Sequence, residues 1–96
     1  MSYKLVFLES AKKEWDKLGH TLREQLKKKL KKCLSTPHIH KNKLSGLQNC
    51  YKIKLRNSGY RLVYKVEDER LVVVVVAIAK RENNLVYKKA GFRSKV

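Results

Sequence analysis

The sequence predicts an α+β fold with elements in the order β-α-α-β-β-β-α, in which an antiparallel sheet carries a two-helix hairpin on one face. Three observations predict it. Apolar residues recur at helical spacing over residues 11–34, alternate with cations over residues 51–56, and form an unbroken run over residues 71–79. The chain has 96 residues and contains no linker-like segment or internal repeat, so we expect a single domain spanning residues 1–96.

A strand and a helix are expected first. Residues 3–8 have the β-type composition of a strand. Ser10 is placed to cap the helix that follows, and Gly19 is placed to end it. The apolar residues at helical spacing in this segment are Ala11, Trp15 and Leu18.

A second helix is expected immediately afterwards. Thr21, with Glu24 three residues on, has the spacing of a capping box at its start, and Thr36-Pro37 is expected to stop it. Its apolar stripe consists of Leu22, Leu26, Leu30, Cys33 and Leu34. The two helices therefore form a hairpin with one apolar face and one cationic face.

Next the apolar period changes from 3.6 to 2, which is typical of strands. In residues 51–56 the odd positions are apolar and the even ones cationic, and after Ser58-Gly59 a second strand covers residues 60–66. A two-residue turn would place Arg56 opposite Arg61. Both strands would then present one core face, which includes Tyr60 and Tyr64, and one cationic face.

The remaining elements follow from a turn and an unbroken apolar run. Residues 67–69, all acidic, indicate a turn, and residues 71–79 lack alternation, which predicts a central strand covered on both faces. Asn83 or Asn84 is placed to cap a last short helix, and Gly91 is expected to interrupt it.

Charge and composition exclude several classes of protein. The formal net charge is +16, with 24 Lys and Arg against 8 Asp and Glu, which indicates a polyanionic partner. The apolar run at residues 5–8 is too short for a signal-peptide core, and that at residues 71–79 is too short to span a bilayer, so we expect no membrane association. Two cysteines without an export signal predict a reduced, cytoplasmic protein.

A compact group of cations is the feature that points to chemistry. Lys52, Lys54, Arg56 and Arg61 share one predicted sheet face, and Arg81 lies just past the central strand. Ordinary solvated charge is one interpretation of this group. The other is a site for a phosphate backbone, because arginine donates bidentate hydrogen bonds to phosphate and lysine adds point charge.

The segments that surround these cations resemble the RelE toxins of bacterial type II toxin–antitoxin pairs. The resemblance is carried by CYKIKLR at residues 50–56, SGYRLVY at 58–64, KRE at 80–82, VY at 86–87 and WDKLGHTLREQLKKKL at 15–30. It implies a microbial-ribonuclease-like fold and a metal-independent endonuclease, without a cofactor, that cuts messenger RNA in the ribosomal A site. The functional residues that it implies are Lys52, Lys54, Arg61, Arg81 and Tyr87.

The residue types agree with attack by a ribose 2′-hydroxyl, which leaves a 2′,3′-cyclic phosphate and a 5′-hydroxyl. Arg61 would stabilise charge on the phosphate, and Lys52 and Lys54 would bind neighbouring phosphates. Repulsion should lower the pKa of one lysine, so either that lysine or Tyr87 would be the general base. Arg81 would stabilise the leaving group more readily than donate a proton to it.

Further cations are candidates for binding RNA outside this group: Lys41, Lys43, Arg56, Lys80, Lys88 and Lys89. Ser45 stands where closely related toxins often have a basic residue, which weakens the case for the loop at residues 41–47. The outer-face lysines 27, 28, 31 and 32 and the basic residues 93 and 95 are either ribosomal RNA contacts or solubilising charge.

The resemblance also implies partners. These are the 70S ribosome with messenger RNA in its A site, 16S ribosomal RNA, and a RelB-like antitoxin, with operator DNA bound only through the toxin–antitoxin complex. The cationic surface suggests an acidic, partly disordered antitoxin that wraps the toxin and displaces Tyr87 with the last helix.

Three other interpretations were weighed. A basic ribosome- or RNA-binding protein without catalysis is the main alternative. A DNA-binding repressor component is disfavoured because the helical hairpin looks packed rather than like a helix-turn-helix. A zinc site at Cys33, His38, His40 and Cys50 matches no standard ligand spacing.

Overall fold

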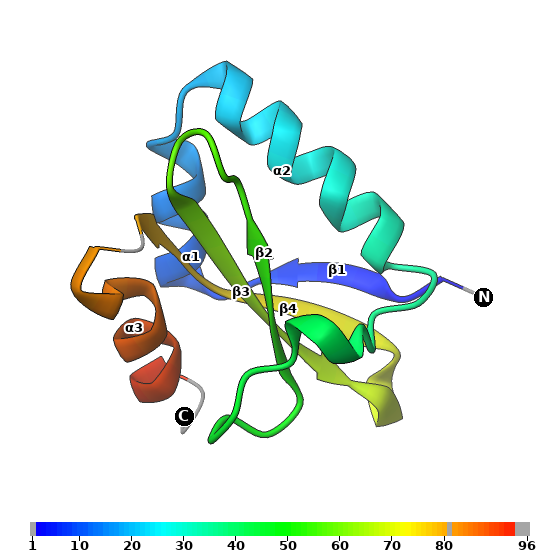
Figure 1. The fold of residues 1–96 in the computed structure, drawn as a ribbon. Helices are drawn as coiled ribbons and strands as arrows, with labels where there is room; N and C mark the ends of the chain where they lie inside the picture. The colour runs from blue at the N-terminus through cyan, green and yellow to red at the C-terminus, as the bar shows by residue number, and fades with distance from the viewer. Residues whose placement is uncertain (1, 81, 94–96) are drawn as a thin grey trace.

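Helices cover both faces of a four-stranded sheet in the computed structural model, which describes residues 2–80 and 82–93. The strands are β1 (Lys4–Phe7), β2 (Cys50–Lys54), β3 (Tyr60–Glu67) and β4 (Val72–Lys80), in the spatial order β1-β4-β3-β2. The helices are α1 (Glu9–Asp16), α2 (His20–Cys33) and α3 (Leu85–Arg93). Figure 1 shows α2 lying across the sheet and α3 near the end of β4. The predicted α+β element order is confirmed.

Two core clusters define the layers. The larger one packs α1 and α2 against the sheet through residues such as Ala11, Leu26 and Tyr64. The smaller one packs Val86 and Ala90 of α3 against the opposite face. Every residue of β4 from Val72 to Ala79 is buried, so the prediction of a central strand covered on both sides is confirmed.

The sheet is mixed, so the prediction of an antiparallel sheet is wrong for one pair of strands. β2, β3 and β4 pair antiparallel, whereas β1 pairs parallel with β4, with Phe7 beside Val75. A tight hairpin requires antiparallel strands, but β1 and β4 are far apart in the sequence and no such constraint applies to them.

The predicted register of the β2–β3 hairpin is wrong by two residues. Lys54, not Arg56, lies opposite Arg61. The chain leaves β2 at Leu55, whose N–H donates to the carbonyl of Tyr60 at 2.9 Å, while the N–H of Gly59 donates to the carbonyl of Leu55 at 2.9 Å. Residues 55–59 thus make a wider turn, with Gly59 at a φ of +77°. Because side chains alternate with a period of two, the shift leaves every predicted face unchanged.

The predicted helix ends also need correction. α1 begins at Glu9 after Leu8, and α2 begins at His20 after Gly19, with no side-chain cap hydrogen bond at either start. Ser10, Thr21 and Glu24 therefore lie inside the helices rather than capping them. Gly91 lies within α3 and does not interrupt it. Among the described residues no helix is both long and apolar enough to cross a membrane.

Candidate active site and nucleic-acid interface

Three cations meet on the sheet face that α3 partly covers. Lys54 lies directly opposite Arg61, and Lys52 is two residues along β2 on the same side. Cys50 and Val63, on this same face, pack in the smaller core cluster with Val86. We call Lys52, Lys54 and Arg61 the cationic cluster. The structure brings these predicted site residues together.

Arg61 is the buried member of the cationic cluster, with 6% of its surface exposed. Its Nη1 donates to the carbonyl of Tyr60 at 3.1 Å. Its neighbour on β4 is Ala79, whose side chain has no polar atom to offer the guanidinium. No carboxylate of the described residues forms an ion pair with it. A buried guanidinium without a counter-ion retains a strong preference for an anion, such as a phosphate.

Lys54 is exposed and shows the effect of crowding. The positive charge of Lys52 lowers the pKa of the Lys54 amine below its ordinary value, and Arg61 and Arg56 add to this effect. The cause is the one expected from sequence: the neutral form of a lysine is favoured among like charges. The lowered pKa raises the fraction of Lys54 amine that is neutral near neutral pH, and only the neutral amine can accept a proton.

Tyr87 projects from α3 over the same face. It is half-buried and packs against the smaller core cluster, which includes Cys50 and Val63 of the hairpin. Tyr87 thus lies on the side of the sheet that holds the cationic cluster. Arg81, the fifth predicted residue, lies outside the described residues.

The outer candidates for RNA binding differ in whether their charge is exposed or paired with an acid. Lys41, Lys43, Arg56, Lys80 and Lys88 are exposed. The Nζ of Lys80 lies 5.9 Å from the centre of the Tyr60 ring, which fixes that amine near the end of β4. Lys89, in contrast, forms a 2.7 Å ion pair with Glu14 and presents less of its charge to RNA.

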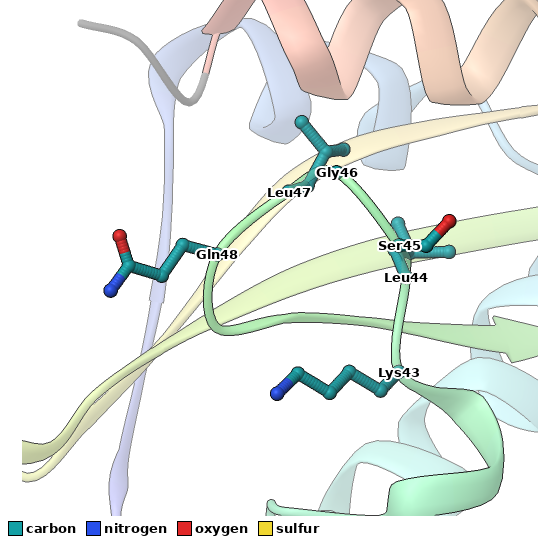
Figure 2. A pocket seen from close by; sticks show the side chains of 6 residues that line it. All are labelled: Lys43, Leu44, Ser45, Gly46, Leu47 and Gln48. Carbon is teal, nitrogen blue, oxygen red and sulfur yellow. The ribbon is translucent and has the colours of Figure 1, made fainter.

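The loop before β2 lines an open hollow of about 530 Å³, bounded by residues 43–48 (Figure 2). Lys43 and Gln48 extend away from the loop, whereas Leu47 points toward α3. A Cβ built on Gly91 would lie 3.7 Å from Cδ2 of Leu47, so the loop contacts this helix. The exposed Ser45 adds no charge here, and the loop contributes packing to α3 as well as Lys43 to the surface.

Glu14 of α1 contacts β4 and α3, and no role for it was predicted from the sequence. Its Oε1 accepts from the backbone N–H of Ile78 at 3.0 Å and from Nη1 of Arg93 at 2.8 Å, and its Oε2 accepts from Lys89. Burial raises the pKa of Glu14, but the hydrogen bonds from Arg93, Lys89 and Ile78 outweigh it and hold that pKa below its ordinary value. Its position three residues after buried Ala11, on the apolar side of α1, was the available signal.

Three of the four candidate zinc ligands are placed apart from one another: His38 contacts other side chains, and the two cysteines lie in different core clusters. Nδ1 of His38 lies 2.9 Å from the hydroxyl of Tyr51, and its Nε2 lies 2.8 Å from Oδ1 of Asp68. Cys33 and Cys50 are buried separately, one in each core cluster. In the described parts of the chain, no three His, Cys, Asp or Glu side chains gather as a metal site would require.

Comparisons with known proteins find relatives over nearly the whole chain. The family model described as "ParE toxin of type II toxin-antitoxin system, parDE" matches residues 5–85. The chain is 60% identical over 90 residues to the mRNA interferase toxin RelE of Escherichia coli K12, covering 94% of this chain and 95% of that protein.

Solved structures show the same likeness. A double-arginine mutant of E. coli RelE in the free state has a TM-score of 0.90 at 58% identity, covering 97% of this chain and 98% of that one. The toxin in the intact E. coli RelBE toxin–antitoxin complex has a TM-score of 0.82 at 60% identity, covering 84% of this chain and 99% of that one.

Proposed function

This chain belongs to the ParE toxin family of type II toxin–antitoxin systems, and from its near-complete match to RelE we propose that it cleaves messenger RNA in the A site of the 70S ribosome. The observation that carries the proposal is the cationic cluster. It combines a buried arginine without a counter-ion, a lysine of lowered pKa and, on the same face, a tyrosine. Such a set binds a phosphate and accepts a proton beside it.

The reaction follows from these groups. The ribose 2′-oxygen attacks the adjacent phosphorus, its proton passes to a base, and the bond from phosphorus to the 5′-oxygen breaks. The 5′-oxygen takes up a proton from water as it leaves, which gives a 2′,3′-cyclic phosphate and a 5′-hydroxyl. Arg61 stabilises the charge that develops on the phosphorane oxygens, because its guanidinium is already held by the carbonyl of Tyr60.

Lys54 is the better candidate for the base. Its amine is exposed and its pKa is lowered by Lys52, whereas Tyr87 is half-buried on apolar residues. Lys52 then holds a flanking phosphate, and Tyr87 offers a ring face for a base of the RNA. Arg81 is assigned the leaving group, a role that rests on the resemblance alone.

Lys54 is a weak general base, because its lowered pKa makes only part of the amine neutral. This weakness explains why cleavage needs the ribosome. Positioning by the A site supplies the in-line geometry that the protein alone does not impose. Exposed lysines on α2 and the outer candidates Lys41, Lys43, Arg56, Lys80 and Lys88 supply contacts to 16S ribosomal RNA and the message. The site of action is accordingly the cytoplasm.

An antitoxin completes the proposal. The RelBE structures show the related toxin with its antitoxin, and the cationic cluster here suits an acidic segment that covers the same face. Repression of operator DNA would come from the complex, because the packed helices α1 and α2 present no recognition helix.

The test is to map cuts on a message held in ribosomes. The unaltered protein should produce discrete A-site cuts, and Arg61→Ala should reduce the cleavage rate roughly 10²-fold or more, because one electrostatic donor contributes that much to such transition states. Arg70→Ala is the matched control, since Arg70 pairs with Glu67 at the opposite end of β3. Binding to ribosomes without cuts would favour the non-catalytic RNA-binding alternative.

A further inference from the structure

The carboxylate of Glu14 joins three elements at one point. It belongs to α1, it accepts the N–H of Ile78 in β4, and it pairs with Lys89 and Arg93 of α3. Only 16% of the Glu14 side chain is exposed. Because Lys89 and Arg93 are four residues apart, they lie on the same side of α3 and converge on this one acid.

The edge of β4 explains why an acid is placed here. β1 ends at Phe7 beside Val75. The last backbone hydrogen bond that the described residues of this neighbouring segment make to β4 runs from the N–H of Leu8 to the carbonyl of Val75, at 3.0 Å. β4 continues to Lys80, so the N–H of Ile78 has no strand partner on that side. Glu14 supplies the acceptor that the missing strand would have supplied.

Apolar packing alone holds α3 weakly. Within Leu85–Arg93 the buried residues are Val86 and Ala90, while Leu85 and Phe92 are 45% and 78% exposed. Arg93 adds a hydrogen bond from Nη1 to the carbonyl of Val76 at 3.0 Å. Tyr87 and Leu47 add partly buried contacts on this side of the sheet. A nine-residue helix is too short to be stable alone and depends on such tertiary contacts, and the ion pairs with Glu14 fix its orientation.

We infer that Glu14 is a positioning residue for RNA cleavage: its carboxylate fastens α3 to the edge of β4 and so holds Tyr87 over the sheet face that carries the cationic cluster. The step from the fastened helix to cleavage rests on the proposed function. The fastening itself does not, and it can be measured on the protein alone.

The first experiment is hydrogen exchange of the isolated protein carrying Glu14→Gln. The amide keeps the shape of the carboxylate and an acceptor for Ile78, but it loses the charge that holds Lys89 and Arg93. We expect exchange in residues 85–93 to rise about tenfold or more while α2 stays protected. Asp16→Asn is the matched control, because Asp16 lies on the same helix and, among residues 2–80 and 82–93, forms an ion pair only with exposed Lys12.

The second experiment measures cleavage on ribosomes. Glu14→Gln should lower kcat about tenfold to a hundredfold, as expected for a misplaced group near the reacting atoms. KM should change by less than about twofold, because Lys52, Lys54 and Arg61 lie on β2 and β3 and still bind RNA. Asp16→Asn should leave both constants unchanged.

A cycle with Lys89→Gln separates positioning from direct RNA binding. If Lys89 acts through Glu14, its substitution lowers kcat in the unaltered protein and adds no further loss to Glu14→Gln. Independent, multiplying losses with a raised KM would instead make Lys89 an RNA contact and overturn its place in this inference.

The outcomes are distinguishable. Unchanged exchange in α3 and unchanged kcat for Glu14→Gln overturn the inference while the proposed function stands. Raised exchange in α3, with no cleavage even by the unaltered protein, overturns the proposed function and leaves the fastening supported. Should Glu14→Gln fail to fold, Lys89→Gln combined with Arg93→Gln removes the other half of the contact, and the same two results are expected of it.

Discussion

The pKa of Lys54 is lowered first by the charge of Lys52, with desolvation and the charges of Arg61 and Arg56 adding to it. Lys54 is exposed, and Lys52 and Arg56 lie two residues to either side while Arg61 faces it across the hairpin. Each of these cations disfavours the protonated amine, and together they lower its pKa. In the proposed mechanism this lowered pKa lets Lys54 act as the base, although the cationic cluster contains no carboxylate or histidine.

Lys52→Met should therefore change the pH dependence of cleavage. Lys52 is the largest cause of the lowered pKa of Lys54, so its removal lets that pKa rise toward the ordinary value. The rate follows the neutral fraction of the base, and the midpoint of the rate profile should move to higher pH. Single-turnover cleavage on ribosomes at a series of pH values measures the shift.

Lys65→Met is the control for that prediction. Lys65 lies on the same sheet face but opposite Cys50, at the far end of the β2–β3 pairing. Its substitution should leave the midpoint in place. A midpoint that also stays in place for Lys52→Met would argue against Lys54 as the base and in favour of Tyr87.

At the scale of elements, periodicity was a better guide than local end signals. The unbroken apolar run of β4 predicted its central position, because no other place in a sheet buries both faces. The capping pattern at Thr21 and Glu24 failed, because α1 ends at Asp16 and the short connection makes α2 begin at His20. Tertiary packing sets where these helices start, and single-residue preferences do not override it.

The sequence predicted the site residues only as far as it predicted which face of the sheet each side chain lies on. Lys52, Lys54 and Arg61 meet although the predicted register was wrong, since a shift of two residues preserves sidedness. The partner of Lys89 was not predictable, because the ion pair with Glu14 spans most of the chain and depends on how α1 and α3 meet at β4. Long-range contacts of this kind leave no local pattern.

The turns make an element-scale prediction about stability. Leu71 ends the β3–β4 connection at a φ of +53°, a conformation that costs a residue with a Cβ about 1–2 kcal/mol. Leu71→Gly removes that cost, but glycine loses more conformational entropy on folding than leucine does. We therefore expect a net gain of roughly 0.5–1 kcal/mol in the free energy of unfolding. Urea denaturation measures it.

Gly59→Ala provides the opposite case. Gly59 has a φ of +77° in the β2–β3 turn, so an added Cβ should destabilise the protein by about 1 kcal/mol. Since nothing lies within 4 Å of the position of that Cβ, the loss would come from the backbone and not from a clash. Equal and same-signed effects at the two turns would contradict the assigned backbone conformations.

For the whole molecule, the distribution of the few acids matters more than the net charge of +16. Glu14, Asp16, Glu67 and Asp68 each pair with a cation or a histidine, and all of these pairs lie outside the cationic cluster. These four acids thus connect parts of the scaffold, whereas Arg61 and its lysine neighbours have no carboxylate partner among the described residues. Self-repulsion in the free protein and attraction to RNA have the same origin.

Salt should accordingly act on stability and on ribosome binding with opposite signs. Raising sodium chloride from about 50 to 500 mM shortens the Debye length severalfold and screens the repulsion among 24 cations, so the unfolding temperature of the free protein should rise. The same change should weaken binding to ribosomes, with a linear fall of log affinity against log salt, because the counter-ions displaced from RNA phosphates gain less entropy when they are released into more concentrated salt. Replacing lysines 27, 28, 31 and 32 of α2 by glutamine should raise the unfolding temperature at low salt and reduce that slope. The rate of cleavage at saturating protein should not change, because these lysines lie on the helix that covers the opposite sheet face. Thermal unfolding and filter binding measure both quantities, and stability that is independent of salt would show that the cations are too widely spaced to repel one another.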